Sequence, residues 1–332
     1  MSDILSFNNN WLQYGGKVVD WIDFNPLNLP PQTLRFRYKA GATPSSSSFP
    51  SGSTLTRVDS SQNVWDLYYP SSNWVEMFKN DRNLVEVLGA NLVADAYGLF
   101  TACTSLTTVH IFDMSKLGTD LHNFFATCVA LTTLPEVLNT SSCENFGNFL
   151  YGCWNLQRVP KIDTSSGISL GSMLAGCSRL KEVVLTDTSS AVTFSNMFNG
   201  CLELEKAPSM NLSSAQDISG MFGSTPSLKT IPQYDTHNVT NMSRLFYNNF
   251  PQYLSGLEHV PLLDTSNVTN MERAFYNCTS VKDGSLDLYR QASSQTNPPS
   301  TYTECFTNCG SNTTTGAAEL AQIPTSWGGT MA

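Results

Sequence analysis

The sequence predicts an α/β solenoid of about ten stacked helix–strand units, preceded by a small β-rich module. Three observations predict this fold class. An aromatic or leucine anchor recurs about every 24 residues, apolar side chains around it fall at helical spacing, and a short apolar strand pattern follows it. One such unit cannot bury its apolar face alone, so several neighbouring units are needed to form a core.

The repeat is clearest in the segment AFYNC, whose Phe275 serves as the anchor for comparing the copies. Equivalent residues follow one another at intervals of about 24 residues along most of the chain, and the last two intervals are longer. The anchors are Phe78, Phe100, Phe125, Leu150, Leu174, Phe198, Phe222, Phe246, Phe275 and Phe306. A fixed period over this many copies indicates a repeat architecture.

A short helix is expected at each anchor. Apolar residues lie four and one before the anchor, at the anchor and often three after it, which is the i, i+3, i+4, i+7 pattern of one helix face. The residue five before each anchor is a helix-capping type, whose side chain is expected to accept a hydrogen bond from a free N–H of the first turn, worth about 1 kcal/mol. These residues are Asn73, Asp95, Asp120, Asn145, Ser169, Thr193, Asp217, Asn241, Asn270 and Thr301.

A short strand is expected after each helix. In the middle copies a leucine stands six residues after the anchor and another apolar residue three further on. Proline often follows, where the strand ends, and an Asp or Asn then occupies the loop. Stacking such units places a parallel sheet on one face and helices on the other, which is the leucine-rich-repeat architecture.

Two regions are expected. Residues 1–63 do not repeat, and the segment QTLRFRYKAG alternates apolar and polar residues as a half-buried strand does. This module either caps the open end of the first repeat or also attaches the chain to a larger assembly. Residues 64–332 form the solenoid, and Leu320, Ile323 and Trp327 are expected to close its far end.

Two segments resemble the BspA-like leucine-rich repeats, in the variant DTSNVTNMxxMFxxCxxLxxIP. They are DTHNVTNMSRLFYNN, Asp235–Asn249, and DTSNVTNMERAFYNC, Asp264–Cys278. The resemblance covers roughly residues 64–332. This variant is common in bacterial surface proteins, mycoplasma lipoproteins and some phage proteins. The resemblance implies a binding or adhesive role, and it brings no catalytic residues to this chain.

The cysteines and acidic residues of the repeat are interpreted as structural. Seven of the nine cysteines stand three after an anchor, but Thr225 and Asn249 replace them in two copies and no short Cys-x-x-Cys pair exists, so the column indicates small buried side chains. Disulfides between neighbouring helices would need Cα atoms about 4.4–6.8 Å apart, closer than packed helices lie. Asx turns explain the loop Asp column better than calcium ligation does.

The chain is therefore expected to hold no metal and no cofactor and to have no catalytic residues, since it contains no nucleophile elbow, phosphate loop or zinc-protease motif. A net charge of −9 without a Lys/Arg cluster argues against nucleic-acid binding. No apolar stretch is long enough to insert into a membrane. The segment MSDILSFNNNWLQYGG lacks the features of a signal peptide, which favours a phage virion protein made in the host cytoplasm over the alternative, a bacterial cell-surface protein.

Function is expected at positions that vary between copies, on the exposed face of the sheet. An ordinary solvated sheet is the plain alternative. The insertions Pro251–Gly256 and Lys282–Ser300 are either part of a binding face or tolerated surface loops. The candidate binding residues are Phe112, Arg158, Lys181, Glu205, Lys229, Tyr234 and His259.

The expected role is that of a tail-fibre or other host-recognition component. Its partners would be a host-cell surface protein or glycan and, through residues 1–63, other virion proteins. The alternatives are a bacterial adhesin and a structural virion protein that binds only other virion proteins.

Overall fold

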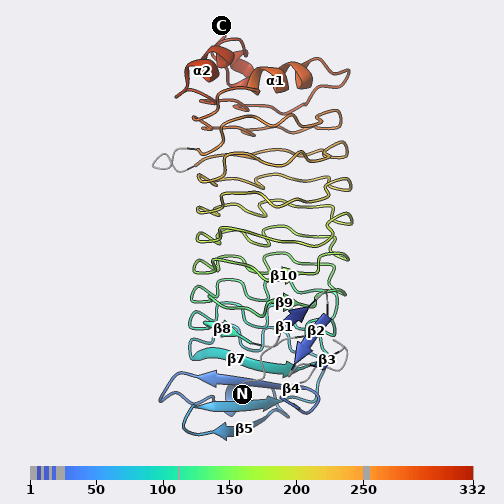
Figure 1. Ribbon diagram of the computed structural model, residues 1–332, viewed down its shortest axis with the longest axis vertical. Helices are drawn as coiled ribbons and strands as arrows, with labels where there is room; N and C mark the ends of the chain where they lie inside the picture. The colour runs from blue at the N-terminus through green and yellow to red at the C-terminus, as the bar shows by residue number, and fades with distance from the viewer. Residues whose placement is uncertain are drawn as a thin grey trace.

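Repeating coils stack into a column, with a sheet at the N-terminal end and two helices at the C-terminal end (Figure 1). In this computed structural model the described residues are 6–8, 11–14, 17–19, 27–110, 113–249 and 255–331. Neighbouring coils correspond to neighbouring copies of the sequence repeat, because single parallel bridges join equivalent residues of successive copies.

Regular strands lie mainly in the N-terminal half, and the α-helices of the described residues lie near the C-terminal end. The largest sheet has the strand order β5-β6-β4-β7-β8, in which β7 is antiparallel to β4 and parallel to β8. A second sheet has the order β1-β2-β3, and β9 and β10 form a parallel pair. The elements are β1 Ser6–Asn8, β2 Trp11–Tyr14, β3 Lys17–Val19, β4 Thr33–Tyr38, η2 Ser46–Ser48, β5 Thr54–Asp59, β6 Val64–Tyr68, β7 Leu84–Asn91, β8 Thr108–Val109, β9 Val137–Leu138, β10 Lys161–Ile162, α1 Ser285–Ser293, α2 Thr314–Leu320 and η3 Thr325–Trp327.

The helix predicted at each anchor is wrong: consecutive turns occupy that part of every described coil. Backbone N–H groups there alternate between two partners. The Phe198 N–H donates to Met221 O of the next coil at 2.9 Å, and the Asn199 N–H donates to Asn196 O of its own coil at 3.0 Å. An α-helix would instead bond each N–H to the carbonyl four residues earlier. The segment is thus a flat ribbon of turns that shares half of its hydrogen bonds with the next coil.

Left-handed backbone conformations explain why a helix does not form. In most coils two residues, two before and two after the anchor, have positive φ, as in Asn196 at 54° and Gly200 at 76°. Glycine and asparagine adopt this conformation most readily, and it interrupts a right-handed helix. Apolar residues at helical spacing still point to the core in this ribbon, so that spacing alone does not distinguish it from a helix.

The residues expected to cap helices make the expected hydrogen bond in a different structure. The Asp217 Oδ1 accepts from the Ser219 N–H at 2.8 Å, and the Asn270 Oδ1 accepts from the Glu272 N–H at 3.0 Å. These are Asx turns at the start of the ribbon. The same residues form a line of parallel bridges from coil to coil.

The anchors form the centre of the core. Phe198, Phe222, Phe246, Phe275 and Phe306 stack one above the next, with ring centroids 5.5–5.6 Å apart. None of the five is more than 5% exposed. Burying a phenylalanine stabilises a fold by about 1.5–3 kcal/mol, so this stack contributes strongly to the cohesion of the coils.

The cysteine column lies beside this stack, and all nine cysteines are buried and free. Thiols in the column donate to the anchor carbonyl of the preceding coil, as Cys128 does to Phe100 O at 3.1 Å and Cys201 to Leu174 O at 3.3 Å. The distance between neighbouring coils does not rule out disulfides, contrary to the expectation. The coils are hydrogen-bonded like strands, about 4.8 Å apart, rather than packed like helices. The structural role is supported by the thiol hydrogen bonds.

The N-terminal sheet covers the first coil. The ring of Phe36 in β4 meets that of Phe78 edge-on, with centroids 5.2 Å apart, and Phe49 meets the same ring at 5.3 Å. The sheet extends past the boundary expected at residue 63, because β6 pairs with both β5 and β4. The strands on either side of that boundary form one antiparallel pair.

The C-terminal cap is built from α1, α2 and η3. Leu320, Ile323 and Trp327 are at most 5% exposed, which confirms that they close the end of the column. The Trp327 ring stacks on Tyr302 at 4.2 Å. The insertion Lys282–Ser300 belongs to this cap, because it contains α1, whose Leu288 is fully buried.

Candidate binding surface

The exposed row of side chains lies along the segments that were predicted as strands, one in each coil. Arg158, Lys181, Glu205, Lys229 and His259 are all exposed there, as expected for a recognition surface. Backbone contacts place successive members on successive coils. The Lys181 N–H, for example, donates to Gln157 O of the preceding coil at 3.2 Å, and Arg158 forms a parallel bridge with Glu182.

Tyr234 does not belong to this row, because its side chain is only 4% exposed. Its hydroxyl donates to Pro208 O at 2.6 Å, and burial raises the pKa of the phenol. Twelve residues before an anchor, Tyr234 shares its column with Leu138, Ile162 and Leu263, which are also buried. That apolar column was the signal for an inward-facing position. Phe112, the remaining candidate, lies outside the described residues.

Ion pairs neutralise the C-terminal part of the row. Glu258 pairs with Lys282 at 2.7 Å and with Lys229 at 3.5 Å. The hydrogen bond from Lys282 lowers the pKa of the Glu258 carboxyl. His259 lies 2.7 Å from Asp283. These side chains pair with one another, so this section has few unpaired charges that could bind a ligand.

The middle of the row differs in a feature that was not predicted from the sequence. Trp154 is 59% exposed and Tyr151 is 44% exposed in the coil that carries Arg158. Arg179 lies on the next coil and is also exposed. Among the described residues, neither arginine has an ion-pair partner. Both aromatic columns hold other aromatic or apolar residues, such as Tyr247, Tyr276 and Leu202, so no clear signal in the sequence marked this exposed pair.

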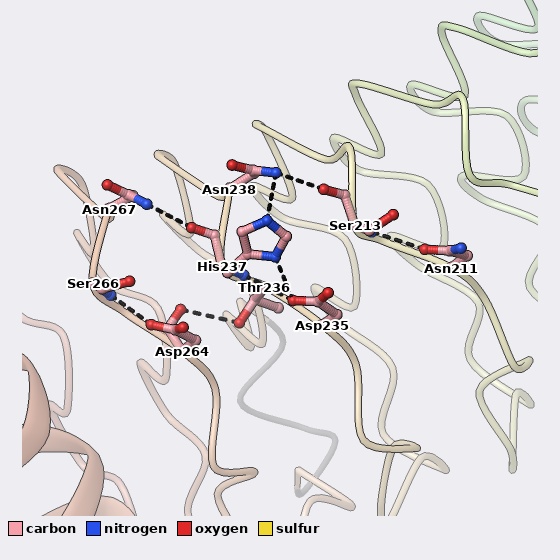
Figure 2. A network of polar contacts seen from close by, with 9 residues as sticks. All are labelled: Asn211, Ser213, Asp235, Thr236, His237, Asn238, Asp264, Ser266 and Asn267. Carbon is pink, nitrogen blue, oxygen red and sulfur yellow. Dashed lines mark hydrogen bonds and ion pairs between the residues drawn. The ribbon is translucent and has the colours of Figure 1, made fainter.

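The loops that carry the Asp-Thr-Ser sequence or a variant of it have a structural role (Figure 2). The Asp264 Oδ1 accepts from the Ser266 N–H at 2.9 Å, and the Thr236 Oγ1 donates to Asp264 O at 3.0 Å. Side-chain hydrogen bonds from Ser266 lower the pKa of the Asp264 carboxyl. The Asn267 Nδ2 donates to His237 O of the preceding coil at 2.7 Å. Each carboxylate thus closes an Asx turn, as the sequence predicted.

The histidines each lie beside a carboxylate: His110 by Glu86, His122 by Asp120, His237 by Asp235 and His259 by Asp283. Within the part of the chain that is described, no three His, Cys, Asp or Glu side chains are placed to hold a metal ion. Over the same residues, no helix has the length and hydropathy needed to cross a membrane.

Comparison with known proteins identifies the repeat family. Two solved structures are similar: a leucine-rich repeat protein from Bacteroides ovatus, with 14% identity over 70% of this chain and 74% of that one, and a leucine rich cell surface protein from Faecalibacterium prausnitzii, with 13% identity over 73% and 89%. Their TM-scores are 0.28 and 0.26. No curated protein matches the chain. The family model described as "Mycoplasma protein of unknown function, DUF285" matches residues 94–210 and 193–311. In agreement with the BspA-like repeats recognised in the sequence, the chain belongs to this family.

Proposed function

We propose that this chain is a non-enzymatic binding protein whose stacked coils are a solenoid scaffold for the exposed row. The proposal is supported by one observation: recurring and variable positions of the repeat have different roles. Residues that recur in most copies serve the core, the turns or the bonds between coils, as Phe198, Cys201 and Asp217 do. Residues of the exposed row, such as Arg158, Lys181 and Glu205, change in charge from coil to coil. Such variation on a constant frame suits recognition.

We place this activity at a cell exterior, in one of two settings. The first is a phage particle, in a tail fibre or another host-recognition component, where the ligand is a host-cell surface protein or glycan. The N-terminal sheet would then also contact other virion proteins. The second is an adhesin on a bacterial surface, and the family description names a bacterium, Mycoplasma.

Binding of the labelled full chain to whole bacterial cells tests the function. Cell binding that falls when Arg158 and Lys181 are replaced by Ala, and that is unchanged by Arg82→Ala, supports the row. Arg82 is a matched control because it is exposed and lies on the first coil, away from this section. If the double variant binds cells as well as the parent chain, the proposed row is wrong.

Fractionation of the native source by size separates the settings. Migration in particles with capsid and tail proteins supports a virion component. A virion protein that travels with particles but binds no cells would instead be structural. Recovery in bacterial envelope fractions that contain no phage proteins supports the adhesin.

A further inference from the structure

The middle of the row combines an exposed aromatic surface with unpaired cations. Trp154 is among the most exposed large apolar side chains of the described residues, at 59%. Tyr151 precedes it by three residues and is also exposed, at 44%. An indole exposed to this degree contributes nothing to the core, whereas Trp74 and Trp327 are at most 5% exposed.

A glycine lies beside the exposed indole. A Cβ atom built on Gly152 would lie 3.7 Å from the Trp154 Nε1, so the indole lies directly beside a bare backbone position. Gly176 and Gly200 occupy the same position in the next two coils, with φ of 74° and 76°. These glycines place no side chain at this position on the coil of Trp154 or on the next two coils, whereas Thr127 occupies it on the preceding coil.

Exposed cations lie on the coil of Trp154 and on the next coil. The Ser178 Oγ donates to Trp154 O at 3.4 Å, which places Arg179 next to the indole-bearing segment. Arg158 lies on the coil of Trp154, and Lys181 lies on the coil of Arg179. Both arginines lack an ion-pair partner in the described part of the chain, and the Lys181 ammonium is 3.7 Å from an exposed carboxylate.

The carboxylates near these cations do not cancel their charge. Glu182 forms a backbone bridge with Arg158, yet their side chains make no ion pair within 4.0 Å. Glu203 pairs loosely with Lys181, and both side chains remain about half exposed, at 48% and 59%. With Glu205 and Lys206, which are exposed on the next coil, four cations stand against three carboxylates, a local balance of one positive charge on a chain whose net charge is −9.

This set of groups fits a sugar better than it fits a protein surface. An aromatic face packs against the C–H face of a pyranose ring, and guanidinium groups bind carboxylate or sulfate oxygens through paired hydrogen bonds. A protein hot spot would need a ring of apolar neighbours that excludes water. Here the intervening Leu156 and Leu180 are fully buried, and Gln157 is exposed, so the surroundings of the indole are polar.

We propose that Tyr151, Trp154, Arg158, Arg179 and Lys181 form a binding site for an acidic glycan, with the aromatic rings under a sugar ring and the cations on its carboxylate or sulfate. This inference rests on the proposed binding function and names the class of ligand for one section of the row. Net attraction depends on charges in water, so affinity decreases as sodium chloride is raised.

The test is a glycan array probed with the full chain. The array holds sialylated, uronate-containing and sulfated oligosaccharides together with their desialylated or neutral counterparts. Retention of one or more acidic glycans above their neutral counterparts is expected. Equal retention of acidic and neutral members, or no retention at all, overturns the proposal.

Variants then assign the site by calorimetry with the best-retained acidic oligosaccharide. Trp154→Ala and Arg158→Ala/Arg179→Ala are each expected to weaken binding by about tenfold or more. Arg82→Ala and Leu262→Ala remove an exposed arginine and an exposed apolar side chain elsewhere, and they are expected to leave the Kd within about twofold. Unchanged affinity in both site variants overturns the assignment.

A hexaglutamate peptide distinguishes a sugar site from a general anion patch. If the peptide binds as tightly as the acidic oligosaccharide and its affinity is unchanged by Trp154→Ala, the site is an anion patch and the glycan proposal fails. Failure on the array while the parent chain still binds whole cells removes only this inference. Loss of both kinds of binding removes the proposed function as well.

Discussion

The Sγ of Cys201 donates a hydrogen bond to the carbonyl oxygen of Leu174 in the preceding coil, with the two atoms 3.3 Å apart. The thiol is fully buried, so it fills space in the core and joins two coils at once. Cys201→Ala removes the hydrogen bond and leaves a small void. We expect a loss of about 1–2 kcal/mol in the free energy of unfolding, measured by urea denaturation. Glu205→Ala on the exposed row is the control, and a loss equal to that of Cys201→Ala would contradict the structural role.

The buried thiols also predict sensitivity to alkali. Burial raises the pKa of Cys128 to about 12 from an ordinary value of 9.0. Between these values the unfolded chain has released the proton while the folded chain retains it, so stability is complete below pH 9 and decreases as the pH rises towards 12. From pH 8 to pH 10 this single thiol accounts for a loss of about 1.4 kcal/mol.

The measurement compares the parent chain with Cys128→Ala at both pH values. The variant is less stable at pH 8, but its stability is expected to depend less on pH by that amount. Parallel pH profiles for the two chains would show that the thiol does not remain protonated in the fold.

Left-handed residues in the ribbon predict a backbone effect. Gly200 has a φ of 76°, and a Cβ there would make only an ordinary contact of 3.6 Å with Gly176. Gly200→Ala is therefore expected to cost about 1–2 kcal/mol through backbone strain rather than through a clash. Thermal unfolding of this variant is compared with that of Ser195→Ala, a ribbon residue without positive φ. A Tm equal to that of the control would count against the turn ribbon and in favour of a helix.

Tyr234 and Arg158 are expected to behave in opposite ways. Tyr234→Phe removes the hydrogen bond to Pro208 O and should reduce stability by about 1 kcal/mol while leaving cell binding unchanged. Arg158→Ala should leave the urea midpoint unchanged and reduce cell binding. Urea unfolding and cell binding are measured on both variants. A loss of cell binding in the tyrosine variant at temperatures where it is fully folded would return Tyr234 to the binding surface.

Much of the fold could be predicted from the sequence, because the repeat period and the buried core both arise from the stacking of equivalent coils. The anchors, the cysteines and the apolar residues around them recur because each occupies the same place in every coil. The helices did not follow, since apolar spacing is the same in a helix and in a ribbon of turns. Glycine and asparagine two residues before and after the anchors, as at Asn196 and Gly200, carried the distinguishing signal. Their positive φ requires the turn.

The binding surface was harder to predict for a related reason. Exposure depends on which side of the coil a column faces, and that side differs between a helix and a turn ribbon. Arg158 and Lys181 are exposed as expected, each in a segment where two exposed residues follow a buried leucine. Trp154 lies in a turn, where no alternation applies, and an indole is ordinarily expected inside. The exposed fraction of its side chain in the structure, 59%, shows that it faces solvent.

The shared backbone bonds between coils have a mechanical consequence. The N-terminal sheet and the C-terminal helices lie at opposite ends of the column, so a pull between them acts along its axis (Figure 1). The bonds between coils, such as that from Phe198 N to Met221 O, are then loaded one coil at a time rather than all together in shear. Each coil that peels away releases about 24 residues, or roughly 80 Å of extended chain. A tether built this way would yield in small successive steps and absorb work under a sudden load.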